Sequence, residues 1–331
     1  MYTKYIKAGW CILMVQDKSQ KKIGVLLSAY NGEKYIEQQI ESIENQTINE
    51  ELTLIIRNDG SSDKTSEILQ QMKKKYSNIV IIQGENIGLI RSFFTLLKIA
   101  VNDYGFDFYS FSDQDDYWKK DKLESAIKHL EQEQNNSDSP LLYGCISTIV
   151  NNELNPTGFK TQTKKKNITF FNSAIQNIIP GHNQVLNKKL ATALVNQPTD
   201  YSKIYSQDLW ITNVAAIVGK IVFENNSHTL YRMHGDNELG YGTSKINRIV
   251  SHLKRLNKQE TKKIAEQLKY FFECYENFLN IEEKNELKEF FSNQKSLKNR
   301  IKYTRKTRFY RQDNKETFLF KTLYLFKQYN V

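Results

Sequence analysis

The chain has 331 residues, with 39% hydrophobic and 12% aromatic side chains, which suffices for one large α/β domain and a helical appendage. This composition excludes a disordered protein. The cysteines Cys11, Cys145 and Cys274 are scattered without CxxC spacing, so they predict neither a disulfide framework nor a zinc site and fit a reducing compartment. No apolar run approaches the ~20 residues that a membrane-spanning helix needs.

The net charge of +10 is concentrated in the last quarter of the chain. Residues 245–331 contain 21 Lys and Arg against 10 Asp and Glu, whereas residues 1–244 contain 26 against 27. A near-neutral first part followed by a basic end argues against a protein built to bind nucleic acid, so we expect no such partner. The pI of about 9.2 and the aromatic residues of the basic end keep that class as an alternative.

Strands and helices are predicted to alternate from residue 22, after a poorly ordered leader over residues 1–21. Short apolar runs predict strands over residues 23–28, 52–57, 79–82, 106–112, 141–149 and, as one or two strands, 221–234. Amphipathic runs predict helices over residues 33–45, 62–75, 89–101 and 118–134. This order favours βαβ units and a mainly parallel sheet, in which ligands bind beyond the carboxyl ends of the strands.

The strongest chemical signal is an acidic cluster at the end of an apolar strand, Ser112-Asp113-Gln114-Asp115-Asp116-Tyr117-Trp118. Carboxylates two residues apart, such as Asp113 and Asp115, can converge on one hard divalent cation. Mg²⁺ or Mn²⁺ prefers such oxygen ligands and shares its shell with substrate phosphates. The cluster therefore predicts a metal site that also binds a diphosphate; the alternative is a solvated acidic loop.

Three other strand ends carry weaker signals. Tyr30, which precedes Asn31-Gly32, can stack on a base while the chain turns tightly. Asp59, in a DGSSD segment, can accept a hydrogen bond from the imide N–H of uracil or thymine, although a helix-capping turn also explains that segment. Arg91 is predicted in the first turn of a helix, where a cation suits an anion-binding site.

Four segments together resemble glycosyltransferase family 2, the inverting enzymes of the GT-A fold. They are AYNGEKYIEQQIESIENQT, IIRNDGSSDKTSEIL, ENIGLIRSF and FSDQDDYWKKDKLE, and the resemblance spans about residues 22–240. It is closest to the rhamnosyltransferase-like branch of bacterial polysaccharide synthesis. The resemblance implies an α/β GT-A fold, a Rossmann-like nucleotide-diphospho-sugar transferase with a mainly parallel sheet flanked by helices. The predicted catalytic domain covers residues 22–244, followed by a basic helical region over residues 245–331.

The resemblance also implies roles for individual residues. The donor-binding residues would be Ala29, Tyr30, Glu33, Asp59, Arg91, Asp113 and Arg232. The metal ligands would be Asp113, Asp115 and His234, and the residues on the acceptor side would be His182, Asn183 and Trp210. Asp208 aligns with the catalytic base, although Gln207 before it departs from the usual acidic residue or histidine. Simple capping by Asp208, loop packing by His182 and a structural role for His234 are the alternatives.

These roles predict inverting transfer of a sugar to a glycan or lipid-linked acceptor in cell-surface polysaccharide synthesis, with Mn²⁺ or Mg²⁺ as cofactor. L-Rhamnose from dTDP-L-rhamnose is the expected donor sugar. A UDP-hexose or UDP-N-acetylhexosamine is the alternative, because thymine and uracil share the imide edge. A non-catalytic relative that binds nucleotides or glycans is a second alternative.

The basic end of the chain predicts a location. Residues 300–311 and 318–327 mix lysine and arginine with aromatic and aliphatic side chains. Amphipathic basic helices of this kind bind anionic membrane surfaces. We therefore expect a cytoplasmic protein held peripherally at the inner face of a bacterial plasma membrane. The alternative is a packing module, or a homodimer formed through these helices.

Overall fold

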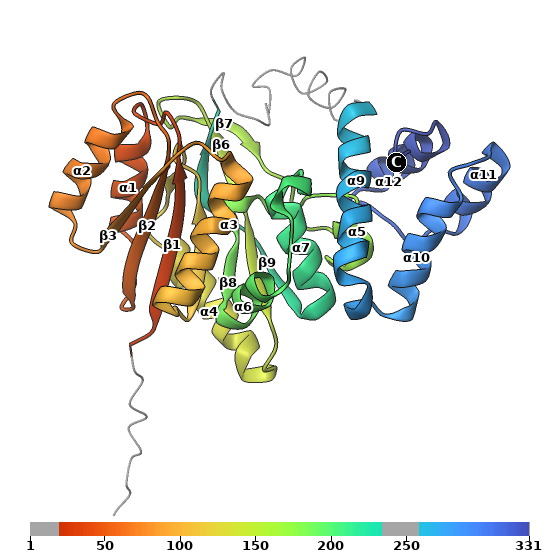
Figure 1. Cartoon of the computed structure of the whole chain (residues 1–331), viewed down its shortest axis with the longest axis horizontal. Helices are drawn as coiled ribbons and strands as arrows, with labels where there is room; N and C mark the ends of the chain where they lie inside the picture. Colours follow the sequence, from red (N-terminus) through yellow and green to blue (C-terminus); the bar gives the residue numbers. More distant parts are fainter. Residues whose placement is uncertain (1–19, 234–257, 331) are drawn as a thin grey trace, which may run out of the picture.

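The computed structural model describes residues 20–233 and 258–330. Within them nine strands form one sheet in the order β3-β2-β1-β4-β8-β6-β9-β5, with β7 beside β6 (Figure 1). The strands are β1 (Lys22–Ala29), β2 (Glu51–Asp59), β3 (Ile79–Gly84), β4 (Phe108–Ser112), β5 (Tyr117–Trp118), β6 (Leu141–Val150), β7 (Pro156–Lys160), β8 (Val185–Asn187) and β9 (Lys220–Arg232). Strands β1 to β4 are parallel, and β8 runs antiparallel to β4 and β6. The expected α/β fold with a largely parallel sheet is confirmed.

Helices cover both faces of the sheet, because the central strands carry apolar side chains on both sides. The first layer contains α1 (Ile36–Glu44), α2 (Thr65–Lys75) and α4 (Lys122–Asn136), and the second contains α3 (Leu89–Ile99), α6 (Lys188–Asn196) and α7 (Gln207–Val218). Val25 and Leu27 of β1 pack with the first layer. Leu26 between them packs with the second. Alternation along β1 therefore separates the two layers.

Beyond residue 257 the described chain forms α9 (Lys258–Tyr275), α10 (Ile281–Ser292), α11 (Leu297–Lys306) and α12 (Asn314–Leu325). Helix α9 stands beside α7 (Figure 1), and the ring of Trp210 on α7 lies 5.3 Å from that of Phe271 on α9. One buried cluster continues from α3 through α7 and α9 to Phe320 on α12. The C-terminal helices thus share their core with the sheet domain. None of the described helices is long and apolar enough to span a membrane.

Two parts of the fold differ from the sequence-based expectation. The helix expected from residue 118 begins at Lys122, because Trp118 belongs to β5 and lies opposite Thr229 of β9. This pairing is a tertiary contact, which the local pattern does not reveal. Strands β7 and β8 and helix α6 were also not predicted. Strand β8 has only three residues, too few for an apolar pattern to indicate a strand. The strand expected over residues 221–234 is confirmed as far as Arg232; His234 lies outside the described residues.

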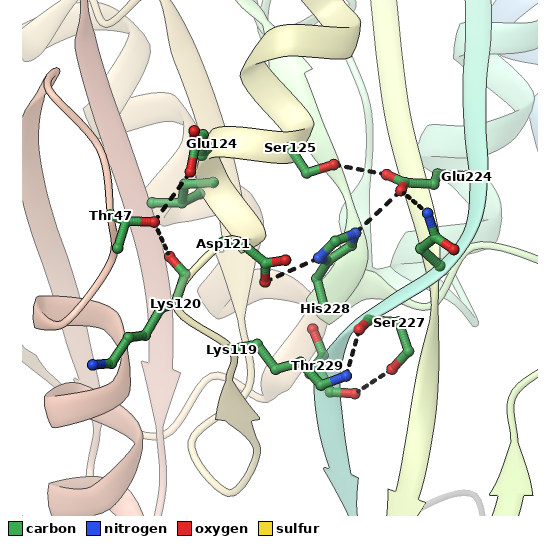
Figure 2. Close-up of polar contacts among 12 residues, drawn as sticks. Thr47, Lys119, Lys120, Asp121, Glu124, Ser125, Glu224, Ser227, His228 and Thr229 are labelled. Atoms are coloured by element: carbon green, nitrogen blue, oxygen red, sulfur yellow. Dashed lines mark hydrogen bonds and ion pairs between the residues drawn. The ribbon is translucent and has the colours of Figure 1, made fainter.

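A polar network fixes α4 to β9 (Figure 2). His228 of β9 lies between two carboxylates, with Nδ1 3.1 Å from Asp121 Oδ1 and Nε2 3.2 Å from Glu224 Oε1. The hydroxyls of Ser125 and Tyr143 donate to Glu224 at 2.8 and 2.7 Å. Burial raises the pKa of Glu224, but its hydrogen bonds outweigh burial and lower the pKa to about 2. The network holds in place the strand that delivers Arg232 to the sheet edge described below.

Glu224→Gln should lower the free energy of unfolding by on the order of 1–3 kcal/mol, because a neutral amide replaces a carboxylate that accepts several buried hydrogen bonds. The folded-state pKa lies below the unfolded-state value, so the ionised Glu224 stabilises the fold above about pH 4.5. That contribution is lost as the pH falls toward about 2. Urea unfolding should therefore show a flatter pH profile for the variant between about pH 5 and pH 2. The exposed Glu37→Gln is the control, and matching profiles for Glu224→Gln and the unaltered protein would contradict the prediction.

Candidate active site

The loops after β1, β2 and β4 meet at one edge of the sheet, because these strands are parallel and in register, with Ala29 beside Asn58. Gln114 joins two of these loops: its oxygen accepts from the Tyr30 N–H at 2.9 Å, and its amide donates to the Tyr30 carbonyl at 3.0 Å. Gly32 makes room for this contact, since a Cβ there would lie 2.3 Å from Gln114 Oε1. Ala29 itself is fully buried.

Tyr30 and Glu33 lie on the exposed side of this edge. The Tyr30 side chain is 48% exposed, so its ring is accessible to a planar ligand. Glu33 connects the first two loops: its carboxylate accepts from the Lys64 N–H at 2.9 Å, and its own N–H donates to Asp63 at 3.0 Å. The two residues therefore frame a shallow surface at the end of β1.

Asp59 has an internal role. It is 2% exposed, and its carboxylate accepts from the backbone N–H groups of Ile87 and Gly88, both at 3.0 Å, and from Arg57. These bonds fix the loop that leads into α3. Arg91, in the first turn of α3, is exposed. Asp59 thus positions the turn that presents Arg91.

Asp113, Asp116 and His182 form the chemical centre of the edge. Each offers one ligand atom, and these atoms all lie within 4.8 Å of one another. His182 Nδ1 is 3.4 Å from Asp113 Oδ2 and 3.3 Å from Asp116 Oδ2. Asp116 Oδ2 is buried and has no hydrogen-bond partner among residues 20–233 and 258–330. A buried carboxylate oxygen without a donor, beside a second carboxylate and an imidazole, fits a divalent cation.

The members of this cluster shift each other's ionisation. Burial raises the pKa of Asp116 to about 7, with Asp115 and Asp113 adding to the shift and His182 opposing it. Burial by itself lowers the pKa of His182, but Asp116 and Asp113 outweigh burial and raise it. A bound cation would favour the ionised carboxylates.

Lys122 is a buried cation that sequence reasoning missed. Its Nζ donates to the carbonyl oxygen of His182 at 2.5 Å and lies 3.3 Å from the centroid of the Trp118 ring. Burial lowers the pKa of Lys122 to about 7. The spacing of Lys122 to Ala126 and Leu130, four residues each, could have placed it on the buried face of α4. Lys122 fixes the turn that carries His182.

Asp115 and Arg232 are placed differently from the expectation. The cluster contains Asp116, whereas Asp115 contributes its carbonyl oxygen, which accepts from Arg232 Nε at 2.9 Å. Arg232 is 2% exposed, and its guanidinium also donates to the Asn152 carbonyl and to Gln38. In this structure the guanidinium of Arg232 contacts protein groups, and its expected contact with the donor diphosphate stays a prediction. Arg232 holds the acidic loop.

The three residues expected on the acceptor side are also buried. His182 is 3% exposed and faces the carboxylates. Asn183 is fully buried, and its amide donates to the Cys145 carbonyl and to Ser147. Trp210 is 1% exposed and packs against α9. Each of these side chains is enclosed by neighbouring elements, and their contact with an acceptor stays a prediction.

Asp208 lies in the first turn of α7 and is partly exposed. Its Oδ2 accepts from Asn177 Nδ2 at 2.5 Å, and its Oδ1 accepts from the Ser206 hydroxyl. A Cβ at Gly181 would lie 3.7 Å from Asp208 Cβ, and the next residue along, His182, faces the carboxylate cluster. The structure thus brings Asp208 beside the cluster, with the carboxylate fixed in orientation.

Comparison with known proteins identifies this arrangement. The family model described as glycosyl transferase family 2 matches residues 24–193, just over half of the chain. The chain belongs to this family. It is a glycosyltransferase, and the predicted family is confirmed.

Individual relatives agree with this assignment. The dTDP-rhamnosyl transferase RfbG of Shigella flexneri is 29% identical over 254 residues, which cover 73% of this chain and 84% of the relative. The structure of residues 1–349 of Staphylococcus aureus TarS in complex with UDP-GlcNAc superposes with a TM-score of 0.53 at 16% identity, covering 93% of this chain and 89% of that one. The mannosyltransferase PcManGT of Pyrobaculum calidifontis, in complex with GDP-Man and Mn²⁺, gives 0.50 at 12% identity, covering 94% and 88%. These two structures confirm the GT-A fold of the family 2 enzyme.

Asp116→Asn should weaken Mn²⁺ binding tenfold or more. The amide lacks the negative charge of the carboxylate, whose buried Oδ2 is available to the ion. Asp113→Asn should have an effect of the same order. Titration followed by Mn²⁺ electron paramagnetic resonance, with UDP present, measures the affinity. The exposed Asp138→Asn is the matched control. Unchanged affinity in Asp116→Asn would show that this carboxylate does not bind the ion.

Proposed function

We propose that this family 2 enzyme inverts the anomeric centre of a nucleotide sugar while transferring the sugar to a glycan or lipid-linked glycan. The adjacency of Asp208 to the Asp113–Asp116–His182 cluster carries the proposal. Transfer with inversion needs one base for the acceptor hydroxyl and stabilisation of the diphosphate that leaves. The base and the group that stabilises the diphosphate belong on opposite sides of the transferred sugar. Gly181 lies against Asp208, and His182, the next residue, faces Asp113 of the acidic cluster.

Asp208 is the proposed base. Its carboxylate, oriented by Asn177 and Ser206, accepts the proton of the acceptor hydroxyl as that oxygen attacks the anomeric carbon. Since the bond to the diphosphate breaks in the same displacement, no carboxylate nucleophile is required. Arg91 and the amino end of α3 face the anionic part of the donor.

Asp113, Asp116 and His182 are the residues that we propose hold Mn²⁺ or Mg²⁺. Asp115 and His234 stay proposed ligands from the sequence, and the latter lies outside the described residues. The bound ion would supply charge stabilisation for the diphosphate. The Mn²⁺ named with the mannosyltransferase complex supports this choice of cation.

The donor that we propose is dTDP-L-rhamnose, since the relative cited above for its sequence, 29% identical over 73% of this chain, is a dTDP-rhamnosyl transferase. Tyr30 would stack on the base, and Ala29, Glu33 and Asp59 would shape its pocket. The UDP-GlcNAc complex of TarS supports a UDP-linked sugar as the alternative. Thermal shift with Mn²⁺ and a panel of nucleotide sugars separates the two, because a bound donor stabilises the fold by mass action.

We also propose that the enzyme acts at the cytoplasmic face of the bacterial plasma membrane in surface-polysaccharide synthesis. Phe318, in the second turn of α12, and Phe326, just after its last residue, are 73% and 71% exposed, and Leu297 on α11 is 57% exposed. Exposed apolar groups among lysines suit an anionic membrane surface. A homodimer through the same helices is the alternative use of these groups.

Asp208→Asn should reduce transfer by 10²- to 10⁴-fold while donor binding persists, because an amide cannot take up the proton. The measurement is release of nucleoside diphosphate in the presence of acceptor, with the donor affinity determined separately by thermal shift. Asp103→Asn, an exposed acidic residue away from the edge, is the control. Near-normal turnover in Asp208→Asn would assign the base to another residue.

Phe318→Ser combined with Phe326→Ser should weaken binding to phosphatidylglycerol vesicles about fivefold or more, because two aromatic groups lose their burial in the lipid interface. Vesicle co-sedimentation measures the effect. Phe278→Ser, at a position 53% exposed between α9 and α10, is the matched control. Equal binding by the double variant and the unaltered protein would contradict the membrane role, and a change in sedimentation mass without vesicles would favour the dimer.

A further inference from the structure

A groove of about 500 Å³ lies between α9 and the segment that leads into α7. The charged and aromatic side chains that line it are Lys203 and Tyr205 on the α7 side and Lys263, Glu266, Lys269, Tyr270 and Glu273 on α9. Lys263, Glu266 and Tyr270 are three and four residues apart, so they line one face of the helix. The groove is therefore formed jointly by the catalytic domain and the C-terminal helices.

Two lysines cross the groove from opposite walls. Lys203 Nζ lies 4.8 Å from the centroid of the Tyr270 ring, and Lys263 Nζ lies 5.1 Å from that of Tyr205. An aromatic face orients an ammonium group without neutralising its charge. Each wall thus directs one ammonium group toward the other wall. Neither ammonium group donates a hydrogen bond to a residue that the structure describes, so the N–H groups are open to a ligand.

The three lysines of the groove outnumber the two carboxylates that line it, Glu266 and Glu273. Lys203, Lys263 and Lys269 form no salt bridge with a described carboxylate, whereas Lys262, one residue away, pairs with Glu266 at 3.5 Å. Elsewhere on these helices Lys306 pairs with Glu289 at 2.6 Å. The three groove lysines therefore lack the salt bridges that these other lysines form. An anionic ligand would supply the missing partner.

The groove is also connected to Asp208. Gln267 of α9 is 1% exposed, and its oxygen accepts from the N–H groups of Tyr205 and Ser206 at 2.8 and 2.7 Å. The Ser206 hydroxyl donates to Asp208. Tyr205 is three residues before Asp208, so the chain between them spans at most about 11 Å. A polymer in the groove would therefore lie close to the carboxylate that we propose as the base.

We propose that this groove binds the acceptor chain and that it selects chains carrying negative charge, through phosphodiester or carboxylate groups, with Lys203 and Lys263 as the principal contacts. This inference rests on the proposed transfer to a glycan. Anionic groups that flank the accepting sugar would lie between the two walls and hold that sugar at Asp208.

The test is binding of the full chain to three probes of similar length, poly(glycerol phosphate), polygalacturonate and dextran, by biolayer interferometry. We expect the protein to bind at least one of the two polyanions and to bind dextran at least tenfold more weakly. The polyanion that binds identifies phosphodiester or carboxylate as the recognised group. Lys203→Ala combined with Lys263→Ala should weaken that binding ten- to thirtyfold, roughly the loss of two charge contacts.

Two further variants distinguish specific binding in the groove from non-specific attraction between a basic protein and a polyanion. Lys302→Ala removes the same charge from an exposed position on α11, outside the groove, and should bind like the unaltered protein. The Lys203→Arg, Lys263→Arg pair should retain binding. Equal binding to dextran, or full binding by the double alanine variant, would overturn the proposal. Donor binding by the unaltered protein is measured separately by thermal shift, so a failure of the transferase proposal is distinguishable from a failure of the groove.

Discussion

The active-site edge depends on a set of charges that are buried together. Asp116, His182 and Lys122 are each 3% exposed or less, and burying any one of them alone would cost several kcal/mol. They come from different elements: the loop after β4, the turn before β8, and the start of α4. Because each charge needs its neighbours, the cluster fixes the relative positions of these elements, and the turn that carries His182 also contacts Asp208.

The acidic loop is held from outside this cluster as well. Gln114 fastens one end to the loop after β1, and Arg232 fastens the other through the carbonyl oxygen of Asp115. A site for a diphosphate needs ligands in fixed positions, since reorganisation during the reaction would raise the barrier. The bidentate contact of Gln114 and the buried guanidinium of Arg232 supply this rigidity without using the acidic side chains themselves.

Much of the fold was predictable from the sequence, because its first half repeats clear strand and helix patterns. The acidic loop, Tyr30 and Asp208 could also be found, since their positions at strand ends and helix starts are local features. The cluster of Asp113, Asp116 and His182 could not be assembled in advance, because β8 and its preceding turn enter the sheet by a contact between residues far apart in sequence. A motif gives the residue type but not the direction of the side chain, so the burial of Arg232, Asn183 and Trp210 among protein groups could not be predicted either.

The shared core of α7 and α9 has a consequence for protein engineering. Trp210 packs edge-to-face against Phe271 of α9, and Gln267 anchors the backbone just ahead of Asp208. A chimera that joined this catalytic half to the helical end of another family member would remove the support of Asp208, the proposed base, even with every side chain of the active-site edge retained. To exchange specificity between two such enzymes, α7, the segment before it and α9 should therefore be transferred together.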